Sequence, residues 1–353
     1  MKKSLLAMAI LGAFAGAASA QSNVTVYGLV DAGLARETGG AAGSVSKISS
    51  GIGSQSRFGF RGKEDLGGGL SAIFVLEGGM TIDNGASTQG GLLFGRTALV
   101  GLEGGFGSVV AGRFFTPYFV TLGFIADPFN AGFAGTAANL IPNLGLRMSN
   151  TVKYTTPDLQ GFSGELAYGF GEIAGDSSAQ RIISAALAYK SGPLNVRLGH
   201  NNKNNDTAVI KGTSNAKNTL LATNYNFGVA RAHLAYGVNK GLNSSPLAAA
   251  NPFGAAVAPT ASTDSANLLL GVAVPFGAST VLASYVRKDD KTRFNQDAHQ
   301  FGVGYTYALS KRTDIYAAYA RITNKNGAGY IAGNGTEVGS GDAAFNLGVR
   351  HTF

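Results

Sequence analysis

Apolar and polar residues alternate along short stretches of this chain with a period of two residues. In residues 162–170, one side of the alternation carries Phe162, Gly164, Leu166, Tyr168 and Phe170. The same alternation occurs in residues 24–30 and 299–307. A two-residue period is typical of a β-strand with one apolar face. The pattern therefore predicts an all-β protein built of amphipathic strands.

The connections between these stretches are of two kinds. Seven are short turns rich in Gly or Pro, at residues 65–69, 103–107, 157–161, 191–193, 226–228, 275–277 and 309–313. Eight are long and polar, at residues 37–50, 83–89, 114–147, 172–178, 204–216, 240–264, 288–295 and 324–341. Together they separate sixteen strands. Short turns at one end and long loops at the other are typical of outer-membrane barrels.

Composition limits the other possibilities. A basic start at Lys2 and Lys3, an apolar stretch at 5–18 and the small residues Ala18-Ser19-Ala20 predict a signal peptide at 1–20. The barrel is then expected at 21–353, with a net charge of +6 once those two lysines are removed from the total of +8. The chain has no Cys, and after residue 20 it has no apolar run of about 18 residues. An exported protein without a membrane-spanning helix is expected to be either an outer-membrane barrel or a secreted all-β protein.

Two segments alternate poorly. Residues 92–102 and 220–227 carry apolar side chains on both sides. We expect them to pack against a neighbouring subunit or against a loop folded into the barrel.

The last strand runs to the end of the chain. Phe345, Leu347, Val349, His351 and Phe353 share one side of the final alternation. In a closed barrel the last strand pairs with the first, so that no edge stays free. The terminal Phe353 is then expected in the apolar band.

Several stretches in order resemble the Gram-negative general porins, which are trimeric sixteen-stranded barrels. The stretches are VTVYGLVDAGL (24–34), SRFGFRGKEDLGGGLSAIFVLE (56–77), FGRTALVGL (94–102), DPF (127–129), NTVKYTTP (150–157), LSKRT followed by IYAAYA (309–320) and GVRHTF (348–353). The resemblance implies a homotrimer in the outer membrane, among lipid and lipopolysaccharide. It also implies that Asn346, Gly348, His351 and Phe353 form an assembly signal read by the outer-membrane insertion machinery.

The resemblance further implies that the third external loop folds into the lumen and faces basic residues of the wall. That loop, Phe114–Arg147, is the longest connection. Its many apolar residues fit a loop packed inside a barrel.

Strand parity assigns some of the basic wall residues to the lumen. Outward Phe58 and Phe60 place Arg57 inside. If Val152 and Tyr154 face outward, Lys153 between them faces the lumen. Arg147 is an even number of residues from Lys153, so it is expected on the same side. Arg96 and Arg113 are assigned to the lumen by the resemblance alone. The simpler alternative is that all of these are ordinary solvated barrel charges.

Asp127 is the only acid of the third loop, so the expected constriction is positive. Asp127 either contributes to the field of the pore or anchors the loop by hydrogen bonds. The predicted function is passive diffusion of small hydrophilic solutes and ions, with a preference for small anions. The alternatives are a channel for one substrate class, a barrel enzyme and a soluble adhesin.

Other chemistry has little support in the sequence. No cofactor and no nucleic-acid partner is expected. The histidines lack the spacing of a metal site, as they fall in separate stretches at His200, His233, His299 and His351.

Overall fold

The computed structural model describes residues 23–143, 145–247, 251–333 and 337–353. The predicted signal peptide at 1–20 lies outside these residues. The strands are β1 (Asn23–Gly40), β2 (Gly43–Ser50), β3 (Arg57–Gly67), β4 (Leu70–Gly79), β5 (Thr97–Gly104), β6 (Gly107–Phe115), β7 (Arg147–Thr155), β8 (Phe162–Gly169), β9 (Ile182–Ser191), β10 (Leu194–Lys203), β11 (Ala216–Asn226), β12 (Arg231–Ser245), β13 (Ser262–Phe276), β14 (Ser279–Asp290), β15 (Ala298–Ala308), β16 (Thr313–Asn324) and β17 (Ala343–Thr352).

The strands form one antiparallel sheet that closes into a barrel, because β1 pairs with β17. The C-terminal part of β1 pairs with β2, and its N-terminal part pairs with β3. These two segments are therefore one interrupted strand of the barrel. Counted by position in the barrel, the described residues form sixteen strands, as the sequence predicts.

The interruption between β2 and β3 has a local cause. The buried carboxylate of Asp31 on β1 accepts hydrogen bonds from the backbone NH groups of Gly53 and Ser54, at 2.9 and 2.7 Å. The backbone of Asp31 also binds the hydroxyl of Ser56. These bonds replace the strand ladder over residues 51–56.

One loop prediction is wrong. The sequence predicts a long polar loop at residues 37–50, but these residues are mainly the end of β1 and the whole of β2. The hairpin turns at Gly40–Gly43 instead. Val45 and Ile48 interrupt the polar residues of this stretch on opposite faces of the strand, and pairing with β1 satisfies the backbone groups. All seven short turns lie between consecutive strands, as predicted.

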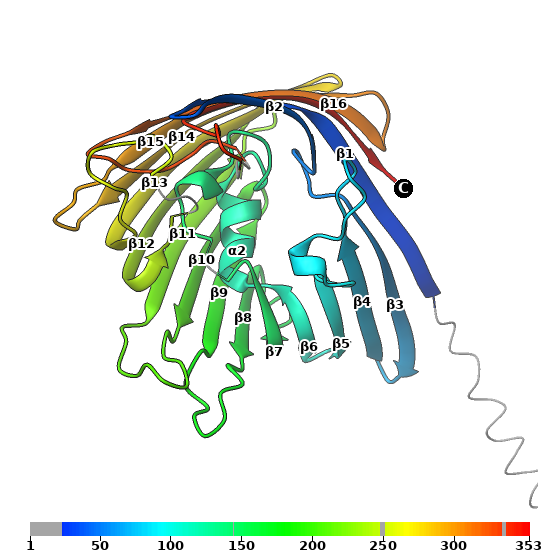
Figure 1. The fold of residues 1–353 in the computed structure, drawn as a ribbon. Helices are drawn as coiled ribbons and strands as arrows, with labels where there is room; N and C mark the ends of the chain where they lie inside the picture. Colours follow the sequence, from blue (N-terminus) through cyan, green and yellow to red (C-terminus); the bar gives the residue numbers. More distant parts are fainter. Residues whose placement is uncertain (1–22, 144, 248–250, 334–336) are drawn as a thin grey trace, which may run out of the picture.

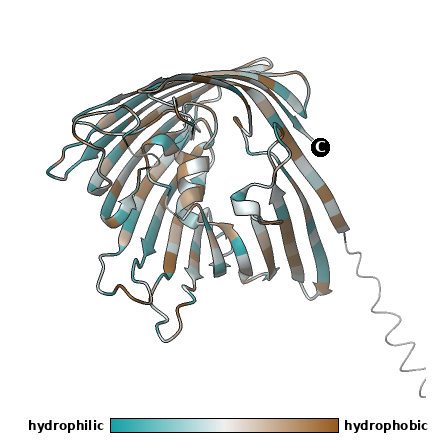
Figure 2. Ribbon diagram, viewed as in Figure 1, coloured by the Kyte–Doolittle hydropathy of each residue, from teal (hydrophilic) through white to brown (hydrophobic). Residues whose placement is uncertain are grey.

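The outer face of the barrel is apolar. Along the strands, bands of hydrophobic and hydrophilic residues alternate (Figure 2). On β15, Phe301 and Val303 are 60% and 53% exposed, whereas Gln300 is fully buried on the other face. An exposed apolar band around a closed barrel suits contact with lipid. No helix in the described part of the chain is long and apolar enough to cross a membrane.

The long connection between β6 and β7 carries short helical turns. These are α2 (Pro117–Thr121), η2 (Leu122–Ala126) and η3 (Ala137–Asn139). A further turn, η1 (Gln89–Gly91), lies between β4 and β5. Thr116 caps α2 by accepting from the NH of Phe119, and Pro117 occupies the first helical position. Figure 1 shows α2 within the curve of the sheet.

The C-terminus closes the barrel at Gly28. Gly28 and Phe353 exchange backbone hydrogen bonds of 3.1 and 3.0 Å. A Cβ atom on Gly28 would lie 2.2 Å from the Phe353 ring, so the ring needs a glycine here. The terminal aromatic residue is therefore part of the seam between the first and last strands.

We expect deletion of Phe353 or the substitution Gly28→Val to lower the yield of folded barrel. The added side chain displaces the ring, at a cost of about 1–3 kcal/mol for overpacking. Heat-modifiable gel migration of outer-membrane fractions measures this yield. Gly105→Ala is the matched control, because a Cβ there meets nothing within 4 Å. Normal yield from both seam variants would contradict the assembly-signal prediction.

Candidate functional site

The β6–β7 segment packs against the face of the sheet opposite the exposed apolar band. Tyr118 and Leu122 are fully buried in a cluster with Leu220 of β11 and Leu269 of β13. On β11 the adjacent Leu221 is 51% exposed on the outer face. The poor alternation of residues 220–227 thus has a cause, since both faces of β11 carry leucine.

Asp127 organises this segment from within. Its carboxylate accepts hydrogen bonds from the NH groups of Phe129, Ala131 and Ala137 at 3.0–3.1 Å, and from the Thr136 hydroxyl at 3.2 Å. Asp127 is 1% exposed. Burial is the larger effect and raises the pKa of Asp127 to about 6, although the four hydrogen bonds act in the opposite direction. This geometry favours the anchoring role over a direct contribution to the field of a pore.

A second anchor joins the segment to the wall near the interrupted strand. The NH of Phe133 donates to the carbonyl of Ile52, and the Phe133 ring packs edge-on against Tyr316 of β16 at 5.0 Å. The Tyr316 hydroxyl donates to the Asp31 carboxylate at 2.6 Å. The interruption between β2 and β3 therefore serves as a contact point for the segment.

A cluster of cations surrounds Glu77 of β4. Arg96 Nε lies 2.7 Å from Glu77 Oε1, and Arg57 Nε lies 3.6 Å from Glu77 Oε2. The Tyr27 hydroxyl also donates to Oε2, at 3.0 Å. Arg96 donates further to the side chain of Gln55. One carboxylate thus holds two arginines in fixed positions.

Arg147 adds a third positive charge beside this cluster. Its Nε donates to the carbonyl of Arg96 at 2.8 Å, and its Cζ lies 4.2 Å from the centre of the Phe115 ring. Within the described residues no carboxylate pairs with Arg147. The cluster then contains three cations, Arg57, Arg96 and Arg147, and one acid, Glu77. Its net charge is an excess of two positive charges.

Lys153 belongs to a different group. It lies 3.6 Å from Glu165 of β8, whose other oxygen is 2.9 Å from Arg197 of β10. Arg197 Nε also donates to the Thr121 hydroxyl of α2, at 3.0 Å. This group ties α2 to the wall and carries an excess of one positive charge.

Arg113 lies beside Arg147, close enough for their charges to repel, but it does not contact Glu77. It lies at the point where the register between β6 and β7 shifts. Its guanidinium donates to the carbonyl of Gly95 at 2.6 Å and to the Ser149 hydroxyl at 2.7 Å. Of the predicted wall cations, the structure therefore brings together Arg57, Arg96 and Arg147, while Lys153 and Arg113 have partners of their own.

A cavity of about 1220 Å³ lies over the Glu77 cluster. Its lining includes Arg57, Arg96 and Arg147. It also includes three aromatic residues, Phe115 at the end of β6 and Phe119 and Phe124 in the connection that follows. Lys47, Asp83 and Glu337 also contribute, but Lys47 already pairs with Glu37 and Glu337. The cavity thus combines a basic wall with an aromatic one.

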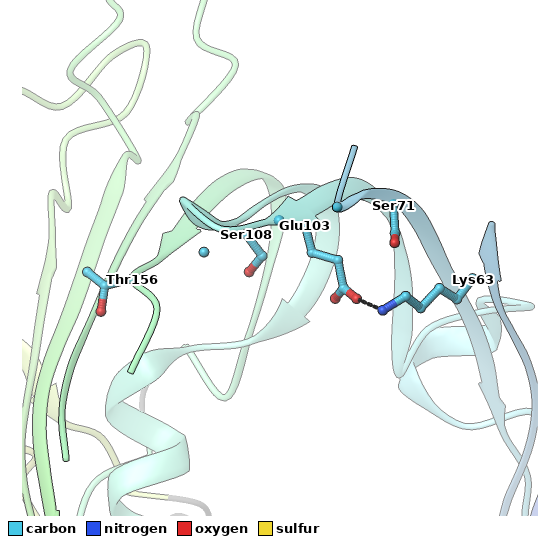
Figure 3. Close-up of a pocket in the computed structure, with 8 residues that line it drawn as sticks. Lys63, Ser71, Glu103, Ser108 and Thr156 are labelled. Atoms are coloured by element: carbon cyan, nitrogen blue, oxygen red, sulfur yellow. Dashed lines mark hydrogen bonds and ion pairs between the residues drawn. The ribbon is translucent and has the colours of Figure 1, made fainter. Parts of the chain in front are cut away.

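A smaller hollow of about 380 Å³ lies among the short turns (Figure 3). Lys63 and Glu103 form an exposed ion pair across it, at 2.5 Å. A pair as open to water as this contributes little energy.

The sequence reasoning missed the acids of the wall. Glu77 and Glu165 sit on spanning strands, and both hold cations. Both acids could have been found from the sequence. A carboxylate that faces lipid is energetically unfavourable, so an acid in a spanning strand is expected to face the interior. The charge of the wall is therefore less positive than the sequence analysis predicts.

Among the described residues, no group of three or more His, Asp or Glu could hold a metal ion. His233 Nδ1 lies 3.0 Å from the Ile125 carbonyl oxygen, and His351 Nδ1 lies 2.9 Å from the Thr313 hydroxyl. These two histidines thus have separate hydrogen-bond partners from other parts of the chain.

Comparison with known proteins identifies the family. A model of the Gram-negative porins matches residues 7–327. The chain belongs to this family. It is 36% identical to outer membrane porin protein 32 of Delftia acidovorans and 35% identical to an outer membrane porin protein of Bordetella pertussis, each over all of both chains.

Solved structures agree with the fold. An anion-selective porin from Comamonas acidovorans superposes with a TM-score of 0.74 at 32% identity, covering 94% of this chain and 100% of that one. A trimeric form of the OmpT outer membrane protein of Vibrio cholerae gives a TM-score of 0.67 at 19% identity, with 94% and 99% covered. The second likeness supports the porin fold alone.

Proposed function

We propose that this porin is a passive diffusion channel of the Gram-negative outer membrane that prefers anions. The observation that carries the proposal is the cluster of Arg57, Arg96 and Arg147 around the single carboxylate of Glu77, all lining one cavity. In a narrow aqueous passage, fixed charges of one sign select mobile ions of the other. The channel acts without catalysis.

The β6–β7 segment is proposed to narrow the passage. It packs on β11 and β13, and Gln300 of β15 donates to its backbone at Gly135. Its aromatic residues share the cavity with the arginines. Asp127 accepts hydrogen bonds from the backbone of the segment itself. The field at the narrowing then comes from the wall, where cations exceed acids.

The similar porin from Comamonas acidovorans is described as anion-selective. At 32% identity and near-complete coverage, this supports the same sign of preference here. The small excess of charge at the cluster predicts a moderate preference rather than exclusion of cations.

The proposal is tested by the reversal potential of the channel in a planar bilayer under a potassium chloride gradient. We expect anion preference in the wild type, weaker preference in Arg57→Ser or Arg96→Ser, and a further drop in the double variant. One fixed charge in a confined passage changes ion free energy by about 1 kcal/mol, or about five-fold in relative permeability. Lys63→Ser is the control, since Lys63 is exposed and lies outside the cavity. Cation preference in the wild type would overturn the assignment of charge.

The assembly is proposed to be a homotrimer. An OmpT form with this fold is described as a trimer, and the apolar outer face of the barrel offers surface for contact. Lipid and lipopolysaccharide are the proposed surroundings, and the insertion machinery the proposed reader of the C-terminal strand. A species of monomer mass after gentle extraction would contradict the trimer.

A further inference from the structure

The cavity over Glu77 is partly aromatic, which a pathway for inorganic ions does not require. Three phenylalanines close together in the chain meet there. Phe115 stacks on Phe119 at 4.8 Å, and Phe124 meets both rings edge-on at 6.1 and 6.0 Å. Phe119 is almost buried, but Phe124 is 46% exposed and lines the cavity. An exposed ring inside a polar passage leaves apolar surface in contact with water.

The guanidinium of Arg147 adjoins this aromatic group. It lies over the face of Phe115, whose other ring contacts are Phe119 and Phe124. Arg147 has no carboxylate partner among the described residues, and its Nε donates to a backbone carbonyl. The terminal NH groups of its fork are thus available to bind an anion in bidentate fashion.

We propose that this corner of the cavity is a binding site for small aromatic carboxylates. The carboxylate binds Arg147, with Arg57 adding positive potential, and the ring of the solute packs on Phe124. Edge-on and offset ring contacts give an aromatic solute an advantage that an aliphatic solute of equal size lacks. The inference rests on the proposed channel function and names one class of solute for it.

The charge of the site argues against an aromatic cation. A cationic solute would be attracted to the ring faces, but it would meet three arginines against the carboxylates of Glu77 and Asp83, because Glu337 already pairs with Lys47. A neutral aromatic solute would leave the guanidinium unpaired. An anion with an aromatic ring can bind Arg147 through its charge and pack on Phe124 through its ring.

The test uses the full-length protein in a planar bilayer at neutral pH and measures block of the chloride current. Benzoate is expected to reduce the current at lower concentration than cyclohexanecarboxylate, which has the same charge and nearly the same size, and than acetate. Phe124→Ala is expected to raise the half-blocking concentration of benzoate about five-fold, with little change for acetate. Arg147→Gln is expected to weaken block by all three anions.

Phe170→Ala is the matched control, because Phe170 is 55% exposed and lies outside the cavity. Equal block by benzoate and cyclohexanecarboxylate, or no effect of Phe124→Ala on benzoate, would overturn the aromatic site. In either case an anion-preferring chloride current would still leave the proposed function standing. A protein that inserts but conducts no current would instead refute the channel itself.

Discussion

The substitutions Glu77→Gln and Arg147→Gln are expected to move the selectivity of the channel in opposite directions. Glu77 is the acid that holds Arg57 and Arg96, so its neutralisation raises the local excess from two positive charges to three. Arg147→Gln lowers the excess to one. Each step corresponds to about 1 kcal/mol of ion free energy, or about five-fold in the anion-to-cation permeability ratio.

Both substitutions keep much of the size and hydrogen bonding of the original side chain. The amide oxygen introduced by Glu77→Gln can still accept from Arg96, so loss of folding is not expected to mask the effect. The reversal potential in a salt gradient is the measurement. Glu103→Gln serves as the control, because Glu103 pairs with Lys63 at the turn end of the barrel. A shift of the same sign in both variants would show that the cluster does not set the field.

The second large effect is expected at Asp127. Asp127→Ala removes the acceptor for three backbone NH groups and one hydroxyl inside a buried part of the segment. Each buried donor left without a partner costs about 1–3 kcal/mol. The segment is therefore expected to lose its internal order and to pack less firmly against the wall, giving a noisier channel with fluctuating conductance and a lower thermal midpoint.

Single-channel recording and heat-modifiable gel migration measure the two consequences. Asp289→Asn is the control, since Asp289 is a partly exposed acid paired with Arg287 on the wall. A quiet channel of normal conductance in Asp127→Ala would mean that the packing of Tyr118, Leu122 and Phe129 holds the segment without help. Asp127 would then have no anchoring role.

Local patterns in the sequence were enough to predict the barrel. Period-two alternation, as in residues 162–170, and the two lengths of connection depend only on neighbouring residues, and both follow from the geometry of a strand between lipid and water. The last strand was predictable for the same reason, since its alternation runs to Phe353. The contact of the Phe353 ring with Gly28 was not predictable, because these residues lie far apart in the chain.

The site was predictable only in part. Strand parity indicated Arg57 and Lys153, and resemblance indicated Arg96, but neither gave their partners. Glu77 joins arginines from β3 and from the loop before β5, and Glu165 joins Lys153 to Arg197. Such pairs depend on the register between strands. A shift of one residue would separate the partners, and no local sequence pattern encodes the register.

The anchoring geometry of Asp127 became visible only in the folded segment. As a sequence position it was one acid in an apolar loop, with two roles left open. In the structure its carboxylate faces the NH groups of residues 129–137, and it does not line the cavity. A buried carboxylate must find donors, and those of its own loop were nearest. Neighbouring residues thus set the strands, whereas the balance of charge in the passage depended on which distant residues the closed barrel brought together.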